Sequence, residues 1–309
     1  LFFIFYKCMI KLHLLFFILL AMGAAFTSDL KIALKYIKSL GKSGNGPLEF
    51  QNPTDIIADR KGNLYIVDSG NNRIQKISSS HTYLAQFGGY GSGQNRLKEP
   101  RGCCMGRGFN IYICDTENQR IVQLDHELKY RAEFQLRDNF KEFKNFRAYD
   151  ICMASNGDIY ISETDEGKII QFTRFDKIKR VFENFSAGIG GFISPVCLRL
   201  INYDIFIGDN NSGSVLKFDL FGNFLFSIGS GIRFTPSCIE SFDADKIIIA
   251  NQRINSLEIF NINGQAIKTI DLKKIIPDLG TCSGIAIYKD KLYVLDSHNN
   301  KIHILWLEK

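Results

Sequence analysis

Short apolar runs, each closed by a polar turn, recur along the chain from residue 64 to the end. In the first copy, the run LYIVD is followed by the turn SGNN and then by a second run, RIQKI. Short continuous apolar runs between turn residues are typical of strands that are buried on both faces. The pattern therefore predicts an all-β protein. The six copies begin at Leu64, Ile111, Ile159, Ile205, Ile247 and Leu292.

The copies are regularly spaced. An acidic or amide residue ends the first run of each copy, and successive residues of this kind lie 42 to 48 positions apart. A period in the forties with strand-rich units is typical of propeller blades with about four strands each. We therefore expect a six-bladed β-propeller. The marking residues are Asp68, Asp115, Glu163, Asp209, Asn251 and Asp296.

The two ends of the repeat array predict how the ring closes. The segment SLGKSGNGPLEFQNP before the first copy resembles QFGGYGSGQNRLKEP after it, so KYIKSL from Lys35 occupies the place of a fourth strand. The last copy stops at KIHILWLEK without a fourth strand of its own. We expect the N-terminal strand to complete the last blade, which removes exposed sheet edges. The propeller domain is expected to span residues 26–309.

Residues 1–25 have the pattern of a secretory signal segment. Met9 is a candidate start, Lys11 supplies a positive charge, residues 12–20 are almost wholly apolar, and residues 23–25 are small. This order of features is typical of a signal peptide, and the apolar run is shorter than the roughly 20 residues that span a bilayer as a helix. The sequence predicts a secreted, periplasmic or cell-surface protein, which would meet a membrane only through a retained signal anchor.

The repeats resemble the NHL repeat, with P-x-G-[IV]-A where each unit starts and [LIV]-Y-[IV]-x-D-x-x-N-x-R-[IV] in its middle. The first, second and sixth units match closely, whereas the third to fifth depart from the motif. Asp and Asn side chains bond the backbone of their own turns, and a nearby basic residue can pair with the Asp. We interpret these motif positions as structural: Asp68, Asn71 and Arg73; Asp115, Asn118 and Arg120; Asp296, Asn299 and Lys301.

Charge and composition narrow the function only slightly. Hydrophobic residues make up 45% and charged residues 23%, as in ordinary globular domains. The net charge of +6 falls to +4 without Lys7 and Lys11, because 36 basic residues then face 32 acidic ones. So small an excess does not require nucleic acid as a partner.

The cysteines predict no structural metal site. Seven remain after the signal segment, and none forms a CxxC pair or a zinc-finger spacing. Most stand within apolar strand patterns, where cysteine behaves as a small buried hydrophobe. Whether any of them pair as disulfides stays open at this point.

The central channel is the predicted site, since the inner strands of all blades converge there. Alignment of the inner strands places Asp55 and Asp150 at one level, with Arg199 and Glu240 two residues further on the same face. Arg199 and Glu240 can form an ion pair between adjacent blades, or all four can line a ligand site. Asp55, Asp150 and Glu240 are also candidate ligands for Ca²⁺, which prefers oxygen; no other cofactor is predicted.

The resemblance to NHL repeats includes an enzyme, the peptidyl-α-hydroxyglycine α-amidating lyase, which is similar in fold and holds zinc through histidines in the channel. No inner strand here carries a histidine; those after the signal segment are His81, His126, His298 and His303. Some NHL propellers bind RNA, and basic residues alternate with Phe near Arg137 and Arg174.

We therefore interpret the chain as an exported, non-catalytic binding or scaffold propeller whose partner is a protein or an anionic ligand. One alternative is a metal-assisted lyase or hydrolase that uses the central channel. A second alternative is RNA or polyanion binding through a basic face, although a signal segment makes nucleic acid an unfavoured partner.

Overall fold

The computed structural model describes residues 32–136, 146–174, 177–182, 194–229 and 234–308. The chain divides into two compact units, residues 1–34 with 307–309, and residues 35–306. Of the first unit, only the start of one strand and the end of another are described, and the expected signal segment lies outside the described residues. Within the described ranges, no helix is both long and apolar enough to cross a membrane.

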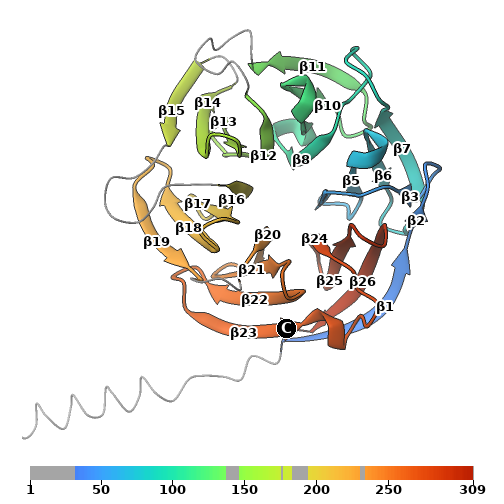
Figure 1. The fold of residues 1–309 in the computed structure, drawn as a ribbon, viewed down its shortest axis with the longest axis vertical. Coiled ribbons are helices and arrows are strands. Elements are labelled where there is room, and N and C mark those ends of the chain that lie inside the picture. Colours follow the sequence, from blue (N-terminus) through green and yellow to red (C-terminus); the bar gives the residue numbers. More distant parts are fainter. Residues whose placement is uncertain (1–31, 137–145, 175–176, 183–193, 230–233, 309) are drawn as a thin grey trace, which may run out of the picture. The chain divides into compact units, whose positions relative to one another are not determined.

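Six four-stranded antiparallel sheets make up the fold, and residues 35–306 arrange them as the six blades of a ring (Figure 1). The first three blades contain β4 (Asp55–Ala58), β5 (Leu64–Asp68), β6 (Arg73–Ile77) and β7 (Tyr83–Gly88); β8 (Pro100–Met105), β9 (Ile111–Asp115), β10 (Arg120–Leu124) and β11 (Tyr130–Gln135); and β12 (Ala148–Met153), β13 (Asp158–Glu163), β14 (Lys168–Thr173) and β15 (Lys177–Phe182).

The other three blades follow the same order. They contain β16 (Pro195–Ile201), β17 (Asp204–Asp209), β18 (Ser214–Asp219) and β19 (Phe224–Ile228); β20 (Pro236–Asp243), β21 (Lys246–Asn251), β22 (Ser256–Asn261) and β23 (Ala266–Asp271); and β24 (Cys282–Tyr288), β25 (Lys291–Asp296), β26 (Lys301–Glu308) and β1 (Ala33–Leu40). The remaining short elements are β2 (Lys42–Ser43), β3 (Glu49–Phe50), η1 (Ser69–Asn71), η2 (Arg107–Phe109), η3 (Thr116–Asn118) and η4 (Leu272–Lys274).

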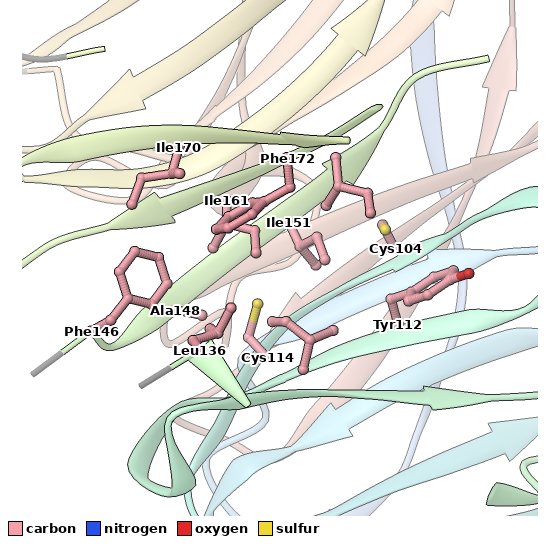
Figure 2. Close-up of a cluster of buried hydrophobic side chains, with 12 residues drawn as sticks. Cys104, Tyr112, Cys114, Leu136, Phe146, Ala148, Ile151, Ile161, Ile170 and Phe172 are labelled. Carbon is pink, nitrogen blue, oxygen red and sulfur yellow. The ribbon is translucent and has the colours of Figure 1, made fainter. Parts of the chain in front are cut away.

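The burial of each strand explains the apolar pattern of the sequence. Every residue of the second strand β5 is buried, because a blade packs between two neighbours, whereas the outer strand β7 alternates between exposed and less exposed residues. Side chains from neighbouring blades form the cores between them. Figure 2 shows one such core, in which Cys114 of the second blade lies with Ile151 and Ile161 of the third.

The ring closes as the sequence predicts. In the last blade the strand order is β1-β26-β25-β24, so the N-terminal strand supplies the outer strand that the C-terminal part of the chain lacks. The six-bladed, all-β prediction is confirmed. The inner strands β8, β12, β16, β20 and β24 lie nearest the centre of the ring (Figure 1), and residues from all six blades line one channel mouth.

Candidate functional site: the mouth of the central channel

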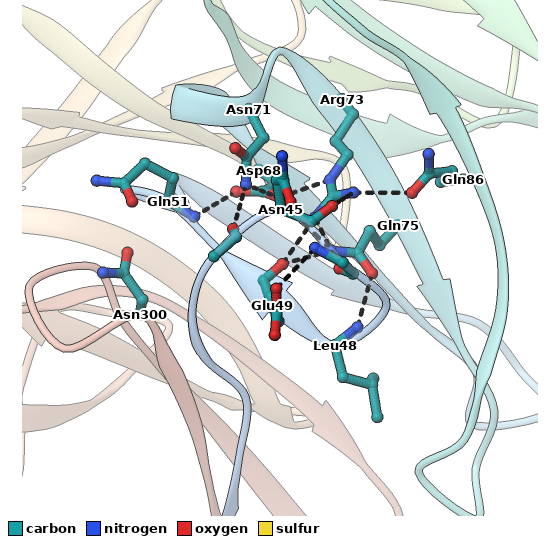
Figure 3. A network of polar contacts seen from close by, with 12 residues as sticks. Asn45, Leu48, Glu49, Gln51, Asp68, Asn71, Arg73, Gln75, Gln86 and Asn300 are labelled. Atoms are coloured by element: carbon teal, nitrogen blue, oxygen red, sulfur yellow. Dashed lines mark hydrogen bonds and ion pairs between the residues drawn. The ribbon is translucent and has the colours of Figure 1, made fainter.

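The repeated turns hold the blades together. In the first blade, Asp68 Oδ2 accepts hydrogen bonds from Arg73 Nε at 2.8 Å and from Asn71 Nδ2 at 2.9 Å. The other guanidinium nitrogens of Arg73 donate to Gln86 and to the backbone carbonyl oxygens of residues 45, 46 and 49, as Figure 3 shows. The second blade repeats the arrangement, because Asp115 accepts from Arg120 at 2.7 Å and from Asn118 at 2.8 Å.

The sixth blade departs from this scheme. Asn299 Nδ2 donates to Asp296 Oδ2 at 2.9 Å, but the ammonium of Lys301 lies 3.8 Å from Asp278 instead of pairing with Asp296. The partner of Asp296 is the buried His303, whose Nε2 lies 3.3 Å from Oδ2. His303 was not identified from the sequence as a partner of Asp296. A signal was present, because His303 stands two residues after Lys301 on the same strand, and side chains two positions apart lie on the same face of a strand.

A cavity of about 160 Å³ opens where the inner strands start. All six blades contribute to its wall. Three of the four predicted site residues line it, namely Asp55, Asp150 and Arg199. Glu240 is not part of the wall, but its Oε2 lies 3.3 Å from Arg199 Nη2, so the two form an ion pair between adjacent blades.

Asp55 and Asp150 each join their own blade to the next one. Asp55 Oδ2 accepts the backbone N–H of Cys103 at 2.9 Å, and Asp150 Oδ2 accepts that of Leu198 at 2.7 Å. In both residues Oδ1 accepts the N–H of the following residue at 2.8 Å. These carboxylates therefore have a structural role that their alignment in the sequence did not reveal.

The charges at the floor of the cavity strongly affect one another. Burial raises the pKa of Asp150 to about 7; the nearby Asp55 adds to the rise and Arg199 opposes it. Burial also raises the pKa of Asp55, again against the attraction of Arg199. Burial by itself would lower the pKa of Arg199, but Glu240 and the two aspartates raise it, so this guanidinium stays charged.

The rim of the cavity carries neutral polar side chains that sequence reasoning missed. Asn210, Gln252 and Ser297 each follow directly after the second strand of their blade. The Oδ1 atom of Asn210 is buried and has no hydrogen-bond partner among the described residues. These three residues have the same position in their repeats, one residue after the acidic or amide residue that ends the first apolar run. An alignment of the repeats could therefore have identified them together.

The other candidate residues, the histidines, the cysteines and the basic segments, do not form a site at this cavity. None of the four histidines lines it, and no group of three His, Cys, Asp or Glu residues suited to a metal ion occurs in the described part of the chain. The seven cysteines of the described ranges are all unpaired and buried. The basic segment predicted near Arg137 lies mostly outside the described residues, whereas Arg174 is in the turn after β14.

Comparison with known proteins supports the fold and leaves the activity open. The family model for the NHL repeat matches residues 50–77. No curated protein sequence matches the chain. Among solved structures, virginiamycin B lyase from Staphylococcus aureus is similar at 14% identity, with a TM-score of 0.62 over 90% of this chain and 100% of that chain.

Two further structures are similar in the same way. A catalytically inactive variant of the same lyase with quinupristin has a TM-score of 0.63 at 14% identity, over 90% of this chain and 100% of that chain. A protein of unknown function from Bacteroides caccae has a TM-score of 0.58 at 11% identity, over 79% of this chain and 87% of that chain. Likeness at these identities shows the fold alone. The matched repeat and the ring of six blades together show a β-propeller that contains an NHL repeat at residues 50–77.

Proposed function

We propose that this propeller is an exported, non-catalytic binding module that holds a small polar ligand at the mouth of its central channel. The observation that carries the proposal is the polar rim, where Asn210 Oδ1 is buried in the cavity wall without a donor. A buried acceptor without a partner costs free energy, and a ligand that donates a hydrogen bond would recover it once the side-chain amide of Asn210 turns toward the cavity. Gln252 and Ser297 also line the cavity and offer further hydrogen-bonding groups.

The aspartates support a binding role more than a catalytic one. Both oxygens of Asp55 and of Asp150 already accept backbone N–H groups, so these carboxylates stabilise the ring. Export follows from the signal-like residues 1–25, and the partner is a protein or an anionic ligand that reaches the channel mouth from outside the cell or from the periplasm.

One observation favours the alternative of a lyase or hydrolase. A carboxyl group with a pKa of about 7 is suited to general acid–base catalysis near neutral pH, and Asp150 lines the cavity. The described residues do not fit the metal-assisted form, because Asp55, Asp150 and Glu240 do not form a group suited to a metal ion. The fold shared with a lyase is compatible with this alternative but does not identify a reaction.

The test is a thermal-denaturation screen of the purified protein against a library of small polar metabolites. A ligand of the channel mouth should raise the Tm of the wild type and should lose this effect in Asn210→Ala and Gln252→Ala. Asn263→Ala, in the exposed turn after β22, is the matched control and should respond as the wild type does. If no compound raises the Tm, the binding proposal is wrong; conversion of the ligand to product would replace it with the enzymatic alternative.

A further inference from the structure

A second cavity adjoins the channel mouth. Its volume is about 300 Å³, and it lies between the first and second blades. Asn52 and Arg101 line both cavities, so the two lie next to each other at these residues. The other lining residues are Ser69, Gly70, Asn72, Tyr90 and Glu99. The two neighbouring cavities together are called the groove.

Arg101 stands at the junction, and among the described residues its guanidinium has one hydrogen-bond partner, Glu99. Its Nη2 lies 3.4 Å from Glu99 Oε2, and its guanidinium lies 5.8 Å from the centre of the Tyr149 ring. The side chain of Glu99 is 53% exposed, and a single exposed ion pair of this kind contributes little stability. A guanidinium has five N–H donors in a planar fork, which suits bidentate binding of a carboxylate. An anionic group of a ligand could therefore pair with the guanidinium of Arg101.

Tyr90 adds an apolar surface to this polar groove. Tyr90 is 72% exposed and stands in the wall of the second cavity. The side-chain amides of Asn52 and Asn72 line the same cavity. An aromatic face beside several neutral hydrogen-bonding groups matches a ligand with an apolar ring face and hydroxyl groups at its edge.

The floor and the size of the channel mouth limit the ligand further. Asp55 and Asp150 line the channel mouth, and their carboxylates would repel a polyanion such as nucleic acid. A volume of about 160 Å³ holds about five water molecules at roughly 30 Å³ each, which corresponds to one ring-sized group. The ligand thus combines one negative charge with a neutral, hydrogen-bonding ring.

We propose that the two cavities form one site for an acidic saccharide. The carboxylate of a uronic acid pairs with Arg101, its sugar ring packs on Tyr90, and the neighbouring neutral sugar enters the channel mouth, where Asn210 and Gln252 bind its hydroxyl groups. This inference rests on the proposed binding function and names the class of ligand for it.

The experiment compares two disaccharides that differ only in one carboxylate, cellobiouronic acid and cellobiose, by titration calorimetry with the full chain. We expect the acidic disaccharide to bind at least about tenfold more tightly, as a charge-assisted hydrogen bond implies. Arg101→Gln should abolish this preference, and Arg101→Lys should keep part of it. Tyr90→Ala should weaken the binding of both sugars. Lys289→Gln, in the turn after β24 and outside both cavities, should change neither.

Four results would overturn the inference. Equal affinity for the two disaccharides would remove the role of Arg101. Equal affinity for acetate and cellobiouronic acid, with Tyr90→Ala unchanged, would reduce the groove to a simple anion site. No binding of either sugar, while the metabolite screen finds another ligand of the channel mouth, would refute the acidic saccharide and leave the binding function intact. A screen without any ligand would refute both. Melting curves of each variant show whether a loss of binding comes from misfolding.

Discussion

Asp150 on β12 accepts the backbone N–H of Leu198 on β16 at 2.7 Å, and this one bond joins the third blade to the fourth. The acceptor is a carboxyl group whose pKa burial raises to about 7, so near neutral pH it is only partly ionised. The hydrogen bond between these two blades therefore depends on the protonation state of Asp150, which lines the channel where we propose that a ligand binds.

The stability of the ring should depend on this proton. The pKa of Asp150 in the folded state lies above the value of about 3.9 that aspartate has in an unfolded chain, so the folded state binds the proton more tightly. Its stabilising contribution is complete below pH 4 and is lost as the pH rises through about 7. We expect Asp150→Asn to lose this part of the pH dependence, measured as unfolding free energy by urea denaturation between pH 5 and 8. Parallel pH profiles for the wild type and the variant would show that Asp150 does not titrate in this range.

Gly102 allows the second and third blades to approach each other closely. A Cβ atom at this position would lie 2.4 Å from Asp150 Oδ1 and 2.8 Å from the carbonyl oxygen of Tyr149. We expect Gly102→Ala to lower the unfolding free energy by about 1 to 3 kcal/mol, because backbone atoms must move. Gly284 has the equivalent place in the sixth blade, but its nearest neighbour would be 3.4 Å away. Gly284→Ala should therefore cost less than about 1 kcal/mol, and equal losses would contradict this explanation.

Arg73 uses every donor of its guanidinium in the first blade, with one bond to Asp68, one to Gln86 and three to backbone carbonyl oxygens. Lysine cannot reproduce this planar fork. We expect Arg73→Lys to destabilise the protein by about 3 to 5 kcal/mol in chemical denaturation, since the buried Asp68 loses its close partner. Arg131→Lys is a suitable comparison, because the side chain of Arg131 is 59% exposed and pairs with Asp125 at the surface. A loss there as large as that of Arg73→Lys would argue against a special role for the turn.

Asp296 should make the sixth blade sensitive to acid. Burial would raise its pKa, but hydrogen bonds from His303, Gly280 and Thr281 outweigh burial and lower it well below the usual range. A lowered pKa means that the stabilisation is present above about pH 4 and is lost as the pH falls below the unfolded-state value. We expect Asp296→Asn to cost about 2 to 3 kcal/mol at pH 7, since Oδ2 no longer accepts its hydrogen bonds.

The measurement is the difference in unfolding free energy between wild type and Asp296→Asn at several values of pH. This difference should shrink as the solution is acidified below pH 4. A difference that stays constant into the acid range would mean that the ionised carboxylate is not the stabilising species.

The sequence was sufficient for the architecture, because the architecture is repetitive. Six copies of one apolar pattern show six blades, and the missing fourth strand after β26 shows where β1 must pair. The contacts between blades were harder to predict from the sequence. Asp55 and Asp150 could be placed on the inner strands, but their bonds to Cys103 and Leu198 depend on how far one blade is shifted against the next, and no local pattern records that shift.

The candidate site was predicted only in its charged part. Arg199 and Glu240 stood out because charges on inner strands are rare, and the structure brings them together. Asn210 and Arg101 looked like ordinary turn and surface residues, since hydrophilic side chains at strand ends are common in any β protein. Their importance comes from the cavities that they line, and cavities depend on packing in three dimensions.

The pairing of β1 with the last blade also determines when the protein can finish folding. During synthesis β1 emerges before the other strands of the ring and its partner β26 emerges after them, so β1 has no partner until all six blades have been made. Contacts between residues this far apart in sequence form slowly, because a long loop must close before they are gained. Until then, β1 and the free edge of β26 stay open to other chains, and the nascent protein is most exposed to misassociation in the interval before the two strands meet.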